Sequence, residues 1–159
     1  MKLSGANVHG TAIIAGTRGI LFVGPSGRGK TSLAFTCMEE ALAAGKFAAL
    51  IADDRVDIRT CDSHVIASRP ETIRDLMELR YGGIVSRKSQ AKAVIHCGAL
   101  IVDPVSAERL PPENETLVFD GGADVPLLRI PSQTPRPLAF LDALMRTRSG
   151  AQRPTGETF

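Results

Sequence analysis

The chain has 159 residues, of which 43% are hydrophobic and 23% charged, and its formal net charge is +2. This length and composition predict one domain with a normal apolar core, and the weak charge gives no basis for a nucleic-acid-binding surface. We expect no membrane span, since apolar runs are short, and no signal peptide at residues 1–7. Cys37, Cys61 and Cys97 are unpaired in spacing, which is typical of thiols in a reducing cytoplasm.

Apolar runs bounded by turn-forming residues predict a series of strands. These are residues 8–15, 19–23, 47–52, 55–60, 64–68, 93–103, 116–119 and 126–131.

Two longer segments show the periodicity of helices. In residues 31–44 apolar side chains recur every three or four positions and Gly45 follows as a stop, and residues 137–148 show the same spacing. A shorter helical turn is predicted after Pro70, with its apolar side formed by Ile73, Leu76 and Met77. The remaining segments are predicted to be loops, at residues 86–92 and 104–115, and a disordered tail at 149–159 that follows a single domain at 1–148.

One octapeptide fits the phosphate-binding pattern G-x-x-x-x-G-K-[ST]: Gly24, Pro25, Ser26, Gly27, Arg28, Gly29, Lys30 and Thr31. A predicted strand precedes it and a predicted helix follows, as this P-loop requires. The glycines let backbone N–H groups turn toward anionic oxygens, and the helix N-terminus adds partial positive charge. We expect Lys30 to reach the β and γ phosphates and Thr31 to offer its hydroxyl to Mg²⁺. The alternative is a glycine-rich turn that only caps a helix.

Asp53 and Asp54 follow the buried run at residues 47–52. A carboxylate at the end of a strand beside the P-loop strand can hold Mg²⁺ or a metal-bound water, and a second one can take the proton of an incoming hydroxyl. Because side chains alternate along a strand, we expect the two carboxylates to point in opposite directions. The alternative is a solvated acidic turn. One helix and one strand fill the chain from Lys30 to Asp53, which leaves little room for a lid and favours an acceptor carried by a macromolecule.

Four stretches together resemble the catalytic domain of HPr kinase/phosphorylase, bacterial enzymes that phosphorylate a serine of HPr, the phosphocarrier of the sugar phosphotransferase system, and can remove that phosphate. They are His9-Gly10, the P-loop, Ala52-Asp53-Asp54-Arg55-Val56-Asp57-Ile58 and Leu76-Met77-Glu78-Leu79-Arg80-x-x-Gly83-Ile84. The resemblance continues through Glu108-Arg109-Leu110 and Arg129-Ile130-Pro131 and covers roughly residues 8–148.

The resemblance implies a role for each matching residue. Lys30 binds phosphate, Thr31 and Glu78 ligate Mg²⁺, and Asp53 assists the metal or positions Asp54. Asp54 itself is the proton acceptor from the serine hydroxyl, and in the reverse reaction it helps phosphate to attack phosphoserine. The residues His9 and Arg109 lie at the active site and stabilise transferred charge. Taken without the resemblance, Glu78 and Arg80 could be an ordinary helix-end pair and Arg109 a solvated loop arginine.

The sequence departs from the family at three places. Members usually carry a further N-terminal domain, whereas this chain begins just before the catalytic domain, as in the short forms. Tyr81 stands where the signature has glycine. The stretch linked to the reverse reaction keeps Arg136 but has Gln133 where an arginine is expected. These departures favour the kinase direction over the phosphorylase direction.

The resemblance implies an α/β fold of P-loop type, with a mixed, partly antiparallel sheet and helices, similar to HPr kinase and the phosphoenolpyruvate carboxykinase core. It also implies ATP and Mg²⁺ as cofactors, HPr or an HPr-like carrier as the partner, and a homo-oligomer, a hexamer. Two alternatives stay open: a small-molecule P-loop kinase, and a non-catalytic module that senses nucleotide.

Overall fold

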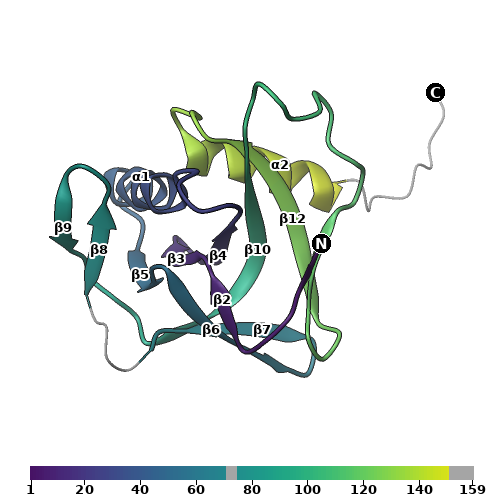
Figure 1. Cartoon of the computed structure of the whole chain (residues 1–159), viewed down its shortest axis with the longest axis horizontal. Coiled ribbons are helices and arrows are strands. Elements are labelled where there is room, and N and C mark those ends of the chain that lie inside the picture. The colour runs from purple at the N-terminus through teal and green to yellow at the C-terminus, as the bar shows by residue number, and fades with distance from the viewer. Residues whose placement is uncertain (71–74, 151–159) are drawn as a thin grey trace.

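Two helices lie against one face of a curled mixed sheet in the computed structural model, which describes residues 1–70 and 75–150 (Figure 1). The helices are α1 (Lys30–Ala43) and α2 (Pro137–Gly150). The strands, in chain order, are β1 (Lys2–Leu3), β2 (Asn7–His9), β3 (Thr11–Ala15), β4 (Arg18–Val23), β5 (Ala48–Ala52), β6 (Arg55–Cys61), β7 (His64–Ser68), β8 (Leu76–Leu79), β9 (Gly83–Ser86), β10 (Lys92–Val102), β11 (Thr116–Phe119) and β12 (Asp124–Pro131).

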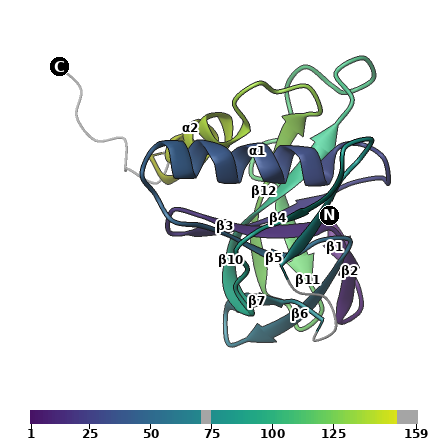
Figure 2. The same ribbon diagram turned by 90° about the vertical axis from the view of Figure 1, so that its left-hand side faces the viewer.

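The long strand β10 joins the two parts of the sheet. Its first residues pair antiparallel with β7, whereas its second half pairs parallel with β4 on one side and β12 on the other. A register shift between Ile95 and Cys97 marks the change of partner, and such a bulge bends a strand. The order through the main part is β1-β11-β12-β10-β4-β3-β5, and β7, β6 and β2 continue from β10 as a second, curled layer (Figure 2).

Apolar side chains cover both faces of the central strands. Along β4, Ile20 and Phe22 pack in the cluster under the two helices, whereas Leu21 and Val23 pack in the cluster enclosed by the curled layer. This alternation follows from the two-residue period of a strand, and burial on both faces explains why β4 and β5 are almost wholly apolar. The strand that leads into the predicted phosphate loop is therefore packed on both faces.

The topology brings three chain segments to one edge of the sheet. Strand β3 pairs antiparallel with both β4 and β5, so β4 and β5 run in the same direction. Their carboxyl ends, which lead into Gly24 and Asp53, therefore lie at the same edge as Thr11 at the amino end of β3. The predicted phosphate loop and the predicted acidic pair meet here.

Two predicted elements differ in the structure. The strand predicted for residues 8–15 is divided at Gly10, because β2 leaves the main sheet to pair with β6 while β3 stays between β4 and β5. The helical prediction was wrong for Leu76 and Met77, which begin the strand β8. A short apolar run does not distinguish a helix from a strand. Here Met77 is buried and Leu76 half exposed, the alternation of a strand that pairs with β9.

The other predicted elements agree with the structure to within about two residues, a normal uncertainty for element ends. Helix α2 continues to Gly150, two residues past its predicted end. Residues 71–74, where the helical turn was predicted to begin, and residues 151–159 of the predicted tail lie outside the described residues. No helix among the described residues is long and apolar enough to cross a membrane.

The three cysteines occupy different environments, and this difference is testable. Cys37 and Cys97 are buried, and burial raises the pKa of the Cys97 thiol to about 12 and that of Cys37 further, whereas Cys61 is exposed. Because the thiolate is the reactive form, we expect iodoacetamide to modify Cys61 alone in the folded protein. Mass spectrometry should show one alkylation without denaturant and three with it. Rapid labelling of Cys37 or Cys97 in the folded protein would contradict the packing of the apolar cluster under the two helices, here called the helix-side cluster, to which both belong.

Candidate active site

The predicted phosphate loop has the backbone conformation that phosphate binding requires. Gly24, Gly27 and Gly29 all have positive φ angles, 133°, 79° and 89°, which let successive amides turn toward one concavity. A cavity of about 370 Å³ lies against the loop, lined by His9, Thr11, Ser26, Gly27, Gly29, Lys30, Thr31, Ser32, Asp53, Asp54, Glu78, Arg80 and Tyr81. Gly24, Pro25 and Arg28 do not line it. Arg28 instead pairs with Asp103 at 2.7 Å.

Lys30 is buried at the base of this cavity, with 7% of its surface exposed. Its Nζ donates to the carbonyl oxygens of Gly24 and Pro25, at 2.9 and 3.0 Å, so the ammonium is held inside its own loop. Burial lowers the pKa of Lys30, and the negative charges of Asp54 and Asp53 oppose that shift. A cation positioned in this way can exchange its carbonyl partners for phosphate oxygens.

Asp53 is fixed by hydroxyl groups from two elements. Its Oδ1 accepts hydrogen bonds from Thr11 Oγ1 at 2.8 Å and from Thr31 Oγ1 at 2.9 Å, and its Oδ2 accepts a longer one from the Glu78 amide at 3.4 Å. Thr31 is the last residue of the P-loop pattern and Asp53 follows β5. A P-loop hydroxyl next to a strand-end carboxylate is the arrangement that holds Mg²⁺ in P-loop enzymes.

Asp54 is mostly exposed and is held by His9. The Nδ1 atom of His9 lies 3.0 Å from Asp54 Oδ1 and 3.1 Å from the Asp54 main-chain oxygen. Both partners are acceptors when the carboxyl group is ionised, so Nδ1 carries the proton. This contact orients the carboxylate and leaves its Oδ2 without a hydrogen-bond partner among the described residues. Asp54 can therefore accept a proton from a group that enters the cavity.

The prediction that strand alternation separates the two carboxylates was wrong in its geometry. Asp54 has a φ of 68°, in the left-handed region, so the chain is already turning after β5. Both carboxylates line the same cavity. What distinguishes them is their surroundings, since Asp53 is half buried among hydroxyls and Asp54 is exposed beside an imidazole.

Besides the phosphate loop and the strand ends, the hairpin of β8 and β9 forms a side of the cavity. Glu78, Arg80 and Tyr81 from this hairpin line the cavity. A Cβ atom built on Gly27 would lie 3.1 Å from Arg80 Nη1, so the guanidinium rests on the phosphate loop. The hairpin therefore adds one carboxylate and one cation to a site built otherwise from the sheet edge.

The oxygen groups fit Mg²⁺ bound together with phosphate. Thr31, Asp53 and Glu78 could supply the oxygen ligands that Mg²⁺ prefers. Within the described part of the chain, no three His, Cys, Asp or Glu side chains are close enough to hold a metal ion by themselves. Mg²⁺ usually takes one or two carboxylates from a protein and fills its other positions with water and substrate phosphates.

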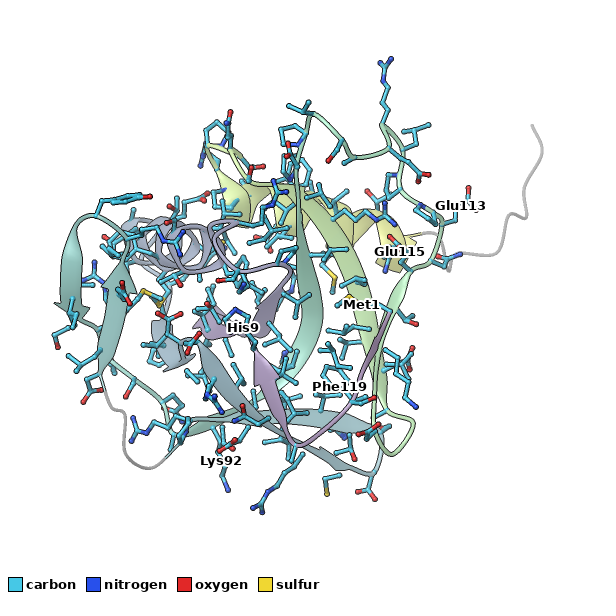
Figure 3. All side chains as sticks on the ribbon, in the orientation of Figure 1. Met1, His9, Lys92, Glu113, Glu115 and Phe119 are labelled. Atoms are coloured by element: carbon cyan, nitrogen blue, oxygen red, sulfur yellow. The ribbon has the colours of Figure 1, made fainter. Side chains whose placement is uncertain are left out.

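Three predicted residues outside the P-loop pattern are also not brought to this cavity. Arg109 lines a separate cavity of about 540 Å³ beside β12 and α2. Figure 3 shows Glu113 and Glu115, which follow Arg109 in the chain, well away from His9. The other two, Gln133 and Arg136, belong to an exposed turn, in which Arg136 lies 3.7 Å from Glu40.

Glu40 is in the last turn of α1, about 15 Å along the helix axis from Lys30. The turn of Gln133 and Arg136 is therefore near the end of α1 that faces away from the phosphate loop.

Sequence reasoning missed Thr11, Ser32, Arg80 and Tyr81 as cavity residues. Ser32 could have been found, because it directly follows the P-loop pattern. Arg80 and Tyr81 belong to a quoted motif, but the helical turn predicted just before them hid the hairpin whose tip they form. Thr11 carries no local signal, since its contact with Asp53 depends on how three strands pair.

Comparison with known proteins identifies the family and supports the fold. The family model described as "HPr Serine kinase C-terminal domain" matches residues 2–141. Among curated proteins, none matches this sequence. A solved structure, the Hpr(Ser) kinase/phosphatase from Coxiella burnetii, has a similar fold, with a TM-score of 0.72 over 91% of this chain and 97% of that chain. Its sequence identity of 18% makes it evidence for the fold alone. Because the family model spans most of its length, this chain belongs to the HPr serine kinase C-terminal domain family.

Proposed function

We propose that this chain transfers the γ-phosphoryl group of ATP, with Mg²⁺, to a serine hydroxyl of HPr or an HPr-like phosphocarrier. One observation carries the proposal: a P-loop hydroxyl and a fixed carboxylate, Thr31 and Asp53, lie beside a second carboxylate that is exposed and oriented, Asp54. Thr31 and Asp53 suit a metal–phosphate complex, and Asp54 suits the role of a proton acceptor. A module that only senses nucleotide has no need of the latter.

In the proposed reaction, Asp54 accepts the proton of the serine hydroxyl as the serine oxygen bonds to the γ-phosphorus and the bond to the β-phosphate oxygen breaks. His9 holds Asp54 Oδ1, which leaves Oδ2 for the proton. Lys30 and Arg80 lie where they can offset charge on the phosphates. Bound Mg²⁺ would supply further positive charge to the phosphate oxygens, held by Thr31 and Asp53 with Glu78 at the rim.

The size of the cavity supports a macromolecular acceptor. At about 370 Å³ it is at the lower end of the range for small-molecule sites, and a nucleotide would take most of it. A small acceptor would need further enclosed space. A serine on the surface of another protein needs only the open side of the cavity, where Asp54 is 74% exposed.

The test is mass spectrometry of purified HPr after incubation with the chain, ATP and Mg²⁺. We expect one added phosphoryl group on one serine, and none when that serine is replaced by alanine. Binding of ATP without phosphorylation of HPr or of any small hydroxyl compound would favour the nucleotide-sensing alternative. Phosphorylation of a small compound only would favour the small-molecule kinase.

We propose further that the reverse reaction, in which phosphate attacks phosphoserine-HPr to release HPr and pyrophosphate, is slower than the forward one. Gln133 lacks the positive charge that would help to hold a second anion, and within one chain its turn lies away from the cavity. Initial rates at equal phosphate and ATP should favour phosphorylation of HPr over dephosphorylation. We expect Gln133→Arg to raise the reverse rate and to leave the forward rate within about twofold, and a wild-type reverse rate above the forward rate would contradict this prediction.

We propose that the protein acts in the cytoplasm as a homo-oligomer, a hexamer by resemblance to its family. Arg109, which lies outside the phosphate cavity of its own chain, would then stand near a neighbouring chain or stay a surface residue. Sedimentation equilibrium of the purified chain distinguishes a monomer from a hexamer directly.

A further inference from the structure

The tip of the β8–β9 hairpin holds a tyrosine in a strained conformation. The Gly82 amide donates to the Leu79 carbonyl oxygen at 2.8 Å and closes a four-residue turn whose third residue is Tyr81. Tyr81 has a φ of 64°, in the left-handed region. A turn with positive φ at this position normally takes glycine or asparagine, and a bulky residue there is an outlier. Strain of this kind persists most often at functional sites.

Tyr81 gains no packing in return for this strain. Its side chain is fully exposed, whereas Met77 on the same hairpin is buried against the helix-side cluster. It nevertheless lines the phosphate cavity, together with Ser32 of the first turn of α1. Its neighbour Arg80 rests on Gly27 of the phosphate loop, so the hairpin tip is anchored at the mouth of the cavity.

Among the described residues that line the cavity, an aromatic ring is the group best suited to a nucleobase, because the guanidinium of Arg80 already rests on Gly27. The loop amides, Lys30 and Thr31 are placed to hold the triphosphate, which leaves the nucleoside at the rim. Of the described residues that line the cavity, Tyr81 and His9 alone are aromatic, and His9 is occupied by Asp54. The remaining lining is glycine, hydroxyl and charged side chains. A fully exposed phenol ring is the available stacking partner.

We propose that Tyr81 stacks on the base of the nucleoside triphosphate and supplies most of the affinity for the nucleoside part. This inference rests on the proposed function, since it names the residue that binds the nucleobase of the phosphoryl donor. Stacking is tolerant of base identity because every base has a π face, so ATP and GTP should bind similarly, and CTP and UTP more weakly.

The test compares Mg²⁺–ATP with inorganic Mg²⁺–tripolyphosphate by isothermal titration calorimetry. Tyr81→Gly should weaken ATP binding about five- to hundredfold, the usual range for loss of one base–aromatic stack. It should leave tripolyphosphate binding unchanged. Its Tm should rise by about 2–4 °C, since glycine accepts the positive φ. Tyr81→Asn, which also tolerates this φ, is the second variant if the glycine variant folds poorly.

Two controls match the variant. Tyr81→Phe keeps the ring and should bind ATP within about twofold of wild type. Ile84 belongs to the same hairpin, is 70% exposed and lies outside the cavity lining. Its replacement by alanine should change neither the affinity for ATP nor that for tripolyphosphate.

Equal ATP affinity in Tyr81→Gly and wild type would overturn the inference. So would an unchanged ATP affinity with a raised KM for HPr, which would mean that Tyr81 contacts the acceptor protein instead. Both results leave the proposed function intact if the wild-type chain phosphorylates HPr. Failure of the wild-type chain to transfer phosphate to HPr would contradict the proposed function itself, whatever the ATP affinities are.

Discussion

Replacing Lys30 with alanine is expected to lower phosphoryl transfer by about 10²–10³-fold and to weaken Mg²⁺–ATP binding, because it removes the cation at the base of the phosphate cavity. Among the described residues, the ammonium donates hydrogen bonds only to the loop carbonyls of Gly24 and Pro25, so the sheet and α1 should stay folded. The measurements are ATP affinity by calorimetry, initial rate with HPr, and the circular dichroism spectrum.

Lys46→Ala is the matched control, since it removes an exposed lysine beyond the far end of α1. It should leave both the affinity and the rate within about twofold of wild type, as surface substitutions usually do. A folded Lys30→Ala protein with normal ATP affinity and turnover would rule out the phosphate loop as the nucleotide site.

Replacing Asp54 with asparagine is expected to lower the rate of transfer to serine by about 10²–10⁴-fold, the usual contribution of a general base. The amide keeps the size of the carboxyl group and can still accept a hydrogen bond from His9, but it cannot take a proton. Binding of Mg²⁺–ATP should persist, because Lys30, Thr31 and Asp53 are unchanged. In this variant the rate of transfer should therefore fall while the affinity for Mg²⁺–ATP stays the same.

Asp62→Asn is a control with the same backbone requirement. Asp62 is also exposed, with a φ of 54°, but it lies in the turn between β6 and β7 and outside the cavity lining. Its replacement should leave the rate unchanged. A comparable loss of rate in both variants would mean that the loss in Asp54→Asn is not specific to the carboxylate at the cavity.

Glu78→Gln should respond to Mg²⁺ where Asp54→Asn does not. Removing a negative charge from the proposed metal site should raise the Mg²⁺ concentration needed for half of the maximal rate, and high Mg²⁺ should restore part of the rate. The measurement is the initial phosphorylation rate of both variants across a Mg²⁺ titration. Rescue of Asp54→Asn but not of Glu78→Gln would mean that the two roles are assigned the wrong way round.

The phosphate loop and most of the fold could be predicted because their signals are local. A strand, a glycine-rich turn and a helix follow one another directly through residues 19–44, and each leaves its own periodicity or turn residues in the sequence. The hairpin at residues 76–86 was harder. Its two strands are only four residues long each, and only pairing between β8 and β9 distinguishes a strand from a turn of helix there.

The sequence by itself determined the family, the mixed α/β fold and the residue types of the candidate site, because these depend on motifs and on hydrophobic pattern. The tertiary structure alone decided how the site is assembled. The contacts of Asp53 with Thr11 and of Asp54 with His9 join residues more than forty positions apart. The first exists because β3 lies between two parallel strands, and the second because β2 pairs with β6. It also separated Arg109 from the cavity and placed Tyr81 at its rim, since the path of a loop and the packing of a hairpin tip against Gly27 depend on contacts between distant segments.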